Sequence, residues 1–149
     1  MNAITFLKQQ HEMAKQGFEE IEQASPDERG ALWEKLGPEL RLHEELEEEH
    51  LYGPVARDAA EDSKLAAWPK RHEDEVAEAE ELMEQIDGFP AEDPDWLALV
   101  KRLKSALDKH IQQEEGDIWP RIERVWDPKH LEQAGKAMDA EVGEAGGEA

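Results

Sequence analysis

The feature that most constrains this chain is a histidine at an interior position of each of four long helical segments. Apolar residues recur at helical spacing over residues 3–24, 27–52, 62–87 and 95–120, a pattern typical of helices that bury one face. His11, His43, His72 and His110 fall on those faces, where the pattern otherwise places aliphatic side chains. A buried charge is costly unless it is paired or bound to a metal. Four such positions therefore indicate a shared polar site inside a helical bundle.

Turn signals set the bounds of these segments. Ser25-Pro26-Asp27 ends the first, Gly53-Pro54 bends or ends the second, and Pro69 predicts a kink or a late start of the third. A loop rich in Gly and Pro precedes the fourth segment, for which Asp95 is the expected N-cap. We therefore expect an all-α protein, an up-down-up-down four-helix bundle over residues 1–126. Residues 127–149 are expected to form a short extra C-terminal helix, over about 128–142, and a disordered tail.

The depths of the four histidines agree with one another. His11 and His43 each lie 13 residues from the turn between the first two segments, and His72 and His110 each lie 15 residues from the turn between the last two. At about 1.5 Å per residue, each histidine lies roughly 20 Å from the same end of the bundle. We therefore expect all four imidazoles to converge at one level.

The second and fourth segments also share a repeated motif. Each reads H-x-x-x-E-E, then two residues, an aliphatic, an aromatic and a nearby proline, beginning at His43 and at His110. An i, i+4 pair presents an imidazole and a carboxylate from one helix face. Glu47 and Glu114 therefore join the histidines as candidate ligands, and two carboxylates on facing helices can each bridge two metal ions. The chain reads as two related helical hairpins.

Imidazole and carboxylate ligands favour iron or manganese over magnesium or calcium, which prefer all-oxygen sites. Zinc stays possible, because the affinity order does not favour iron over zinc. The segment from His43 to Glu47 lacks the second histidine of H-E-x-x-H, so it does not match a zinc peptidase. Cysteine is absent from the sequence, which excludes disulfides and thiolate ligands.

The charge of the chain limits its partners. A formal net charge of −21 argues against nucleic acid and against anionic membrane surfaces. No apolar run approaches the roughly 20 residues of a membrane-spanning helix. The N-terminal residues lack the basic and apolar regions of a signal peptide, so a cytoplasmic location is expected. For the oligomeric state we expect a monomer or a weak homodimer.

These motifs resemble those of the hemerythrin-like HHE cation-binding proteins. The resemblance rests on one His in the first segment, the two H-x-x-x-E-E motifs, and Arg71-His72-Glu73 at the start of the third. It covers about residues 4–125, and the tail after Asp127 resembles the extra helix that many members carry. It implies a hemerythrin-like bundle that holds two iron ions, bridged by Glu47, Glu114 and an oxo or hydroxo ligand.

The resemblance also implies how the other ligands divide. His11 and His43 would bind one iron, and His72 and His110 the other. Oxygen-carrying hemerythrins have a further histidine where this chain has Val76. Glu44 is one candidate for the missing ligand, by similarity to the hemerythrin-like domain of an iron-sensing ubiquitin-ligase subunit; a solvated glutamate is the alternative.

Four other polar residues are distinct from these ligands. Glu75 and His50 are lesser candidates for the missing ligand, and the alternative for His50 is a partly exposed histidine at the end of the helix. Tyr52, the only tyrosine, is expected to pack near the site, and His130 to lie on the surface.

Two functions follow as hypotheses. In the first, the di-iron site binds or reduces O2, peroxide or NO, for oxygen or redox sensing or for peroxide decomposition. Weak peroxidase, catalase-like or oxidase activity would then be possible. In the second, the chain is an iron-responsive regulatory module that acts through a protein partner without catalysis. Iron storage fits less well, because one site holds only two ions.

Overall fold

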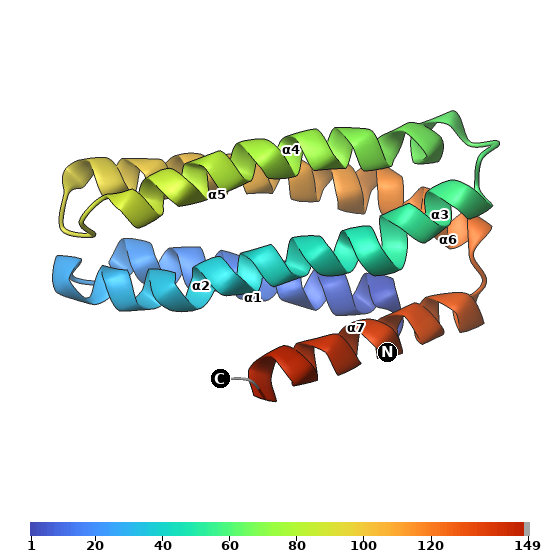
Figure 1. Cartoon of the computed structure of the whole chain (residues 1–149), viewed down its shortest axis with the longest axis horizontal. Coiled ribbons are helices and arrows are strands. Elements are labelled where there is room, and N and C mark those ends of the chain that lie inside the picture. Colours follow the sequence, from blue (N-terminus) through green and yellow to red (C-terminus); the bar gives the residue numbers. More distant parts are fainter. Residues whose placement is uncertain (148–149) are drawn as a thin grey trace.

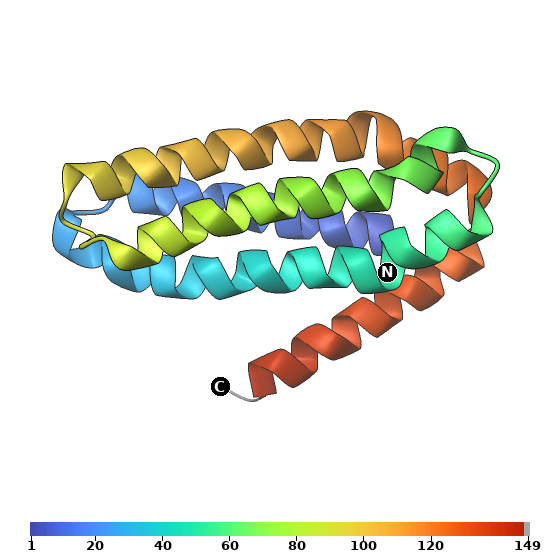
Figure 2. The ribbon, with the colours of Figure 1, turned by 45° about the horizontal axis from the view of Figure 1, so that its top comes forward.

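The computed structural model describes the backbone of residues 1–147 and the side chains of residues 1–144, and every regular element among them is helical. Helices α1 (Ala3–Gln23), α2 (Pro26–Glu47), α4 (Ser63–Gly88) and α5 (Pro94–Gln113) lie alongside one another (Figures 1 and 2). Helix α7 (Pro128–Gly147) packs outside them, against α1, and the N-terminus of the chain lies beside the middle of α7. The all-helical fold is therefore confirmed, with five helices of 20 or more residues.

Helix ends follow local chemistry. The side chains of Asn2 and Asp62 accept hydrogen bonds from backbone N–H groups in the first turns of α1 and α4, as N-cap residues do. The expected N-cap of the fourth segment is wrong: Asp93 caps α5, Pro94 occupies the first turn, and Asp95 lies inside the helix. Proline favours that first position because its missing N–H would have no helical partner there.

The second and fourth segments continue past their prolines. A π-helical turn, η1 (Glu48–Tyr52), joins α2 to α3 (Gly53–Asp58), and an equivalent turn, η2 (Glu114–Ile118), joins α5 to α6 (Trp119–Val125). Proline cannot donate to the carbonyl four residues before it, and its ring clashes with that carbonyl. An i→i+5 turn just before the proline accommodates it, so the helical run continues through Gly53-Pro54.

The C-terminal helix is longer than predicted. It extends from Pro128 to Gly147, beyond the expected end near residue 142 and into the segment expected to fray. Gly135 lies against the backbone of Met1–Ala3, and a Cβ there would overlap the Met1 carbonyl oxygen. Residues 148–149 of the predicted tail lie outside the described residues.

The core consists of two apolar clusters with a polar layer between them. One contains Leu7, Leu46 and Trp119 with neighbours from α3, α4, α6 and α7, and the other contains Phe18, Leu40 and Leu103 with neighbours from α2, α4 and α5. The buried polar residues are His11, His43, Glu44, Glu47, His72, His110 and Glu114. They occupy the middle of the bundle, between the two apolar clusters.

Candidate metal centre

The two H-x-x-x-E motifs bring their side chains into the polar layer from the ends of α2 and α5. Glu47 is the last residue of α2, and Glu114 begins the π-helical turn after α5. Both carboxylates are completely buried. Because an i→i+5 turn adds one residue, the residue five positions after each glutamate, Tyr52 or Trp119, is also buried near the layer. π-helical turns of this kind are frequent at functional sites.

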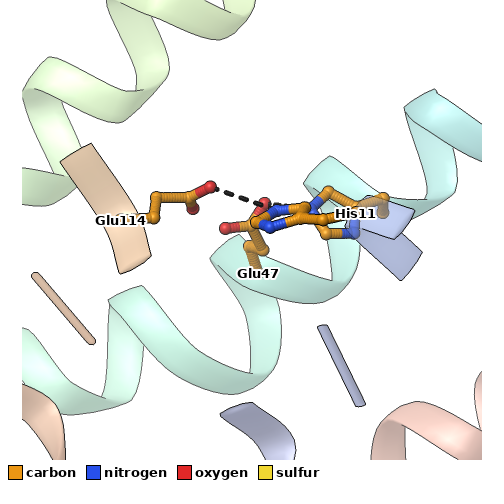
Figure 3. Close-up of side chains that lie close together, drawn as sticks. His11, Glu47 and Glu114 are labelled. Atoms are coloured by element: carbon orange, nitrogen blue, oxygen red, sulfur yellow. Dashed lines mark hydrogen bonds and ion pairs between the residues drawn. The ribbon is translucent and has the colours of Figure 1, made fainter. Parts of the chain in front are cut away.

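One group of potential ligands combines His11, His43, Glu47 and Glu114, whose facing atoms all lie within 4.8 Å of one another. His43 Nε2 lies 2.6 Å from Glu47 Oε1, and His11 Nε2 lies 3.4 Å from Glu114 Oε1. Figure 3 shows the His11 imidazole and the carboxylates of Glu47 and Glu114 turned toward one another. The two Nε2 atoms of His11 and His43 are 3.2 Å apart, so one must carry a proton or both lone pairs must face a cation.

A second group combines Glu44, Glu47, His72 and His110, again within 4.8 Å. His72 Nε2 lies 3.0 Å from Glu44 Oε2. Glu47 belongs to both groups, and Glu114 Oε1 lies 3.4 Å from the Nε2 atoms of both His11 and His110. The two glutamates of the repeated motif thus stand between two histidine pairs.

The donor atoms in this layer are not satisfied by one another. Among the described residues, five atoms that face the centre lack a hydrogen-bond partner: Glu44 Oε2, Glu47 Oε1, His72 Nε2, His110 Nε2 and Glu114 Oε1. Two of these atoms, His72 Nε2 and Glu44 Oε2, are 3.0 Å apart but lack hydrogen-bond geometry. Buried polar groups are rarely left unpaired. Imidazole nitrogens and carboxylate oxygens directed at common points suit a pair of transition-metal ions.

The outward nitrogens of the histidines have partners of their own. Nδ1 of His11 donates to Glu115 over 2.9 Å, and Nδ1 of His43 donates to the amide oxygen of Gln10 over 2.7 Å. A donor Nδ1 leaves the Nε2 lone pair free to face the centre, and such outer partners orient metal-binding histidines.

His110 follows the same arrangement, whereas His72 has only a nearby carboxylate on its outer side. Nδ1 of His110 lies 2.5 Å from Glu75 Oε2, and Nδ1 of His72 lies 3.4 Å from Glu48 Oε1 without hydrogen-bond geometry. Three of the four imidazoles therefore face a carboxylate on their outer side.

Tyr52 connects the two glutamates. Its hydroxyl lies 2.8 Å from Glu47 Oε2, contacts Glu114 Oε2, and accepts a 2.8 Å hydrogen bond from Trp119 Nε1. A hydroxyl has one proton, so Tyr52 donates to one carboxylate at a time. Burial, followed by the charge of Glu47, raises the pKa of Tyr52 well above its usual value, which keeps the hydroxyl protonated.

The charges in this layer depend on each other. Burial raises the pKa of Glu47, but the imidazoles of His43, His72 and His110 outweigh it and hold that pKa well below its usual range. Burial lowers the pKa of His43 and His72, but carboxylates outweigh it: Glu47 for His43, and Glu44 with Glu47 for His72.

His11 differs from these two histidines, because burial and the neighbouring His43 lower its pKa. In the absence of a cation, the layer thus holds the Glu47 carboxylate as an anion, and His43 and His72 bind a proton more readily than His11 does.

The structure brings together all seven residues that the sequence indicated: His11, His43, Glu44, Glu47, His72, His110 and Glu114. Glu44 is 7 % exposed, which argues against a solvated glutamate. Glu75 contacts the outer side of His110 instead of the centre. His50 lies away from the centre and pairs with Glu141 of α7 over 3.1 Å. His130 stacks on Trp126.

The sequence did not identify Gln10, Glu115 or Glu48 as outer partners. The one signal in the sequence is that each of the three is adjacent in the chain to a candidate ligand, His11, Glu114 or Glu47.

The chain belongs to the hemerythrin HHE cation-binding domain family, whose sequence profile matches residues 2–122. The fold is similar to the crystal structure of a hemerythrin HHE cation-binding domain-containing protein from Mycobacterium kansasii. That similarity has a TM-score of 0.79, with 27% identity over 97% of this chain and 86% of the other.

A curated relative is a protein named DNA nickase from Nostoc sp., 25% identical over 134 residues. The match covers 89% of this chain but 37% of that protein, so this chain spans little more than a third of the relative's length.

Proposed function

We propose that the chain is a non-haem di-iron protein that binds or reduces O2 or peroxides. The observation that supports this most is the shared position of Glu47, whose carboxylate belongs to both groups of potential ligands. His11 and His43 would hold one ion, and His72, His110 and Glu44 the other, with Glu47 and Glu114 between them. The four helices that carry these ligands would form the up-down-up-down bundle of the family, with α7 added.

Iron suits this ligand set better than the alternatives. Four imidazoles and three carboxylates form a mixed nitrogen and oxygen set, whereas magnesium and calcium prefer oxygen alone. Manganese fits less well, because a site with nitrogen ligands binds ferrous iron more tightly than manganous manganese. The affinity order does not exclude zinc, so metal analysis is needed to distinguish zinc from iron. When bound, a pair of ferrous ions supplies two electrons and open coordination positions for O2, peroxide or NO.

The protein's own groups favour reduction of these ligands over reversible carriage. The site replaces an imidazole of the oxygen carriers with a carboxylate, Glu44, and adds carboxylates behind three histidines. Negative charge near a metal stabilises its more positive oxidation state. Tyr52 keeps the carboxylates of Glu47 and Glu114 together through its hydroxyl.

Metal analysis of anaerobically purified protein, joined to its visible spectrum before and after air, tests this proposal. We expect two irons per chain and new absorption bands on oxidation, followed by turnover of added hydrogen peroxide with a reductant. A single zinc per chain, or no iron, would contradict the proposal. A reversible, long-lived adduct with O2 would keep the di-iron site but contradict the redox role.

A second candidate is a metal-responsive regulatory module, and one observation favours it. His50, which lies in the π-helical turn directly after Glu47, pairs with Glu141 of α7 over 3.1 Å. A change at the site can therefore alter the contact with the outer helix. A large fall in melting temperature on chelation, together with no peroxide turnover, would favour this function, because metal binding then supplies folding free energy.

We propose no contact with nucleic acid for this chain, although a longer relative is named DNA nickase. The net charge of −21 opposes binding to phosphates, which needs clustered Lys and Arg. We also propose a monomer or weak homodimer in the cytoplasm. In the part of the chain that the structure covers, no helix is both long and apolar enough to cross a membrane.

A further inference from the structure

A cavity of about 150 Å3 lies between α1, α2 and α5, beside the candidate metal centre. At one side it is lined by His11, His43, Glu44 and His110 of the polar layer. Its remaining wall is mostly apolar, with Phe18, Leu36 and Leu107 among its residues, and the polar side chains that also line it are Gln10, Lys15, Glu39 and Asp108. The cavity thus places residues of the polar layer beside a mostly apolar surface.

The size of the cavity limits what it can hold. An apolar cavity of about 150 Å3 stays dry and binds a benzene-sized molecule. Hydrogen peroxide gains nothing from apolar walls, because its two hydroxyl groups need hydrogen-bond partners there. An alkyl or aryl group of about six carbon atoms fills the space and buries its surface against Phe18 and the leucines.

Access for polar molecules lies on a different side of the site. A wider hollow between α4 and α5 reaches His110 and Glu44 past Arg71, Lys109 and Gln113. The candidate centre therefore has one apolar and one mixed, charged approach. Water and protons are accommodated on the charged side, and a hydrophobic group on the apolar side.

We propose that the cavity binds the hydrocarbon part of an organic hydroperoxide, whose peroxide group then points at the polar layer. This inference rests on the proposed di-iron function and names its substrate class. Reduction of ROOH to ROH and water breaks the O–O bond and takes up two protons and two electrons. A ferrous pair, when bound by the polar layer, would supply both electrons and would end as a ferric pair.

Ala14 is the position from which to test the inference. It lies one turn after His11 on α1 and lines the cavity, so Ala14→Leu places three more carbon atoms in that space. Ala98→Leu is the matched control: the same substitution on α5, at an exposed residue outside the cavity. Metal content is measured in both variants, and comparisons are made per bound iron pair.

The first readout is binding without chemistry. Crystals of the metal-loaded protein are exposed to xenon and, separately, to 2-phenyl-2-propanol, the alcohol product of cumene hydroperoxide. We expect both in the cavity of the wild type and of Ala98→Leu, and neither in Ala14→Leu. If the alcohol does not occupy the wild-type cavity, the inference is wrong. Xenon without the alcohol would indicate a cavity for gases and would also overturn it.

The second readout is the ratio of the reaction rates with cumene hydroperoxide and with hydrogen peroxide. One extra or missing methylene group in an apolar pocket changes selectivity by about 10- to 200-fold. We expect Ala14→Leu to lower the ratio by at least 10-fold and Ala98→Leu to leave it unchanged. A ratio that Ala14→Leu does not alter, with hydrogen peroxide still reduced, overturns the inference alone. If neither peroxide reacts with the wild type, the proposed function is wrong, and the inference with it.

Discussion

Glu44 offers the sharpest test of how the site is built. It is nearly completely buried, and its Oε2 lies 3.0 Å from His72 Nε2 without a hydrogen-bond partner among the described residues. Glu44→Gln keeps the size of the side chain and removes its charge. We expect the variant to lose affinity for the second iron and to keep the first, for which His11 and His43 are the proposed ligands.

The size of the effect follows from the number of ligands. Apparent binding free energies of four-ligand structural zinc sites are about 10–16 kcal/mol, or roughly 2.5–4 kcal/mol for each ligand. At 1.36 kcal/mol per tenfold, losing one ligand weakens binding by about 70- to 900-fold. The amide oxygen of glutamine remains a weak ligand, so we expect the lower end of this range.

Anaerobic titration with ferrous iron, read by calorimetry and by metal content after dialysis, measures the effect. Glu45→Gln is the control, because Glu45 is the next residue on α2 and is exposed. We expect two irons in that control and one tightly bound iron in Glu44→Gln. If the second iron binds Glu44→Gln within threefold of the wild type, Glu44 is not a ligand and the reasoning fails.

Three further predictions concern the surroundings of the site. Tyr52→Phe removes the hydroxyl that Trp119 Nε1 and a carboxylate oxygen contact. Calorimetry of the metal-loaded protein should therefore show a free energy of unfolding lowered by about 2 kcal/mol, which corresponds to a melting temperature lowered by roughly 4–8 °C. An unchanged melting temperature contradicts this. Gly135→Ala drives a Cβ into the Met1 carbonyl, so hydrogen exchange in α7 should become faster, whereas Gly143→Ala, which meets nothing within 4 Å, should not change it. Metal binding should release protons and weaken as pH falls through the raised pKa values of two histidines; equal heats in buffers of different ionisation enthalpy would refute this.

Much of the site could be predicted from the sequence because its ligands interrupt a regular pattern. His11, His72 and His110 occupy positions where the helical period requires apolar residues, and each is buried as the period predicts. The repeated H-x-x-x-E spacing placed Glu47 and Glu114 on the same faces. Each of these patterns involves residues of one helix, so the geometry of a single helix is enough to predict which side chains share its interior face.

The π-helical turn η1 explains why His50 does not face the interior of the bundle. A period of 3.6 residues places His50, three residues after Glu47, on the interior face. The extra residue in η1 rotates the chain that follows, so His50 turns toward α7 and Tyr52 lies above Glu47 instead. Prolines after both turns signal an irregularity, but their spacing alone does not distinguish a helix end from a π-helical turn.

The outer partners of the histidines could not be predicted for a different reason. Glu75 reaches His110 from another helix, and Glu115 reaches His11 in the same way. Such contacts depend on how far each helix is rotated about its axis and on side-chain rotamers. In a chain with 38 acidic residues, many glutamates are candidates for any one position, and only the packed bundle selects among them.

Not all of the acidic side chains are solvated, because some of them face the candidate site. Carboxylates lie near the outer nitrogens of His11, His72 and His110, while His43 faces the uncharged amide of Gln10. An imidazole that donates to a carboxylate gains electron density at Nε2 and becomes a stronger ligand for a ferric ion. Among these carboxylates, Glu115 and Glu75 are hydrogen-bonded to their imidazoles, whereas Glu48 lies 3.4 Å from His72 Nδ1 without hydrogen-bond geometry. We therefore infer that each half of the site has one imidazole strengthened by a carboxylate, and that Glu44 gives the half with His72 and His110 the larger share of negative charge.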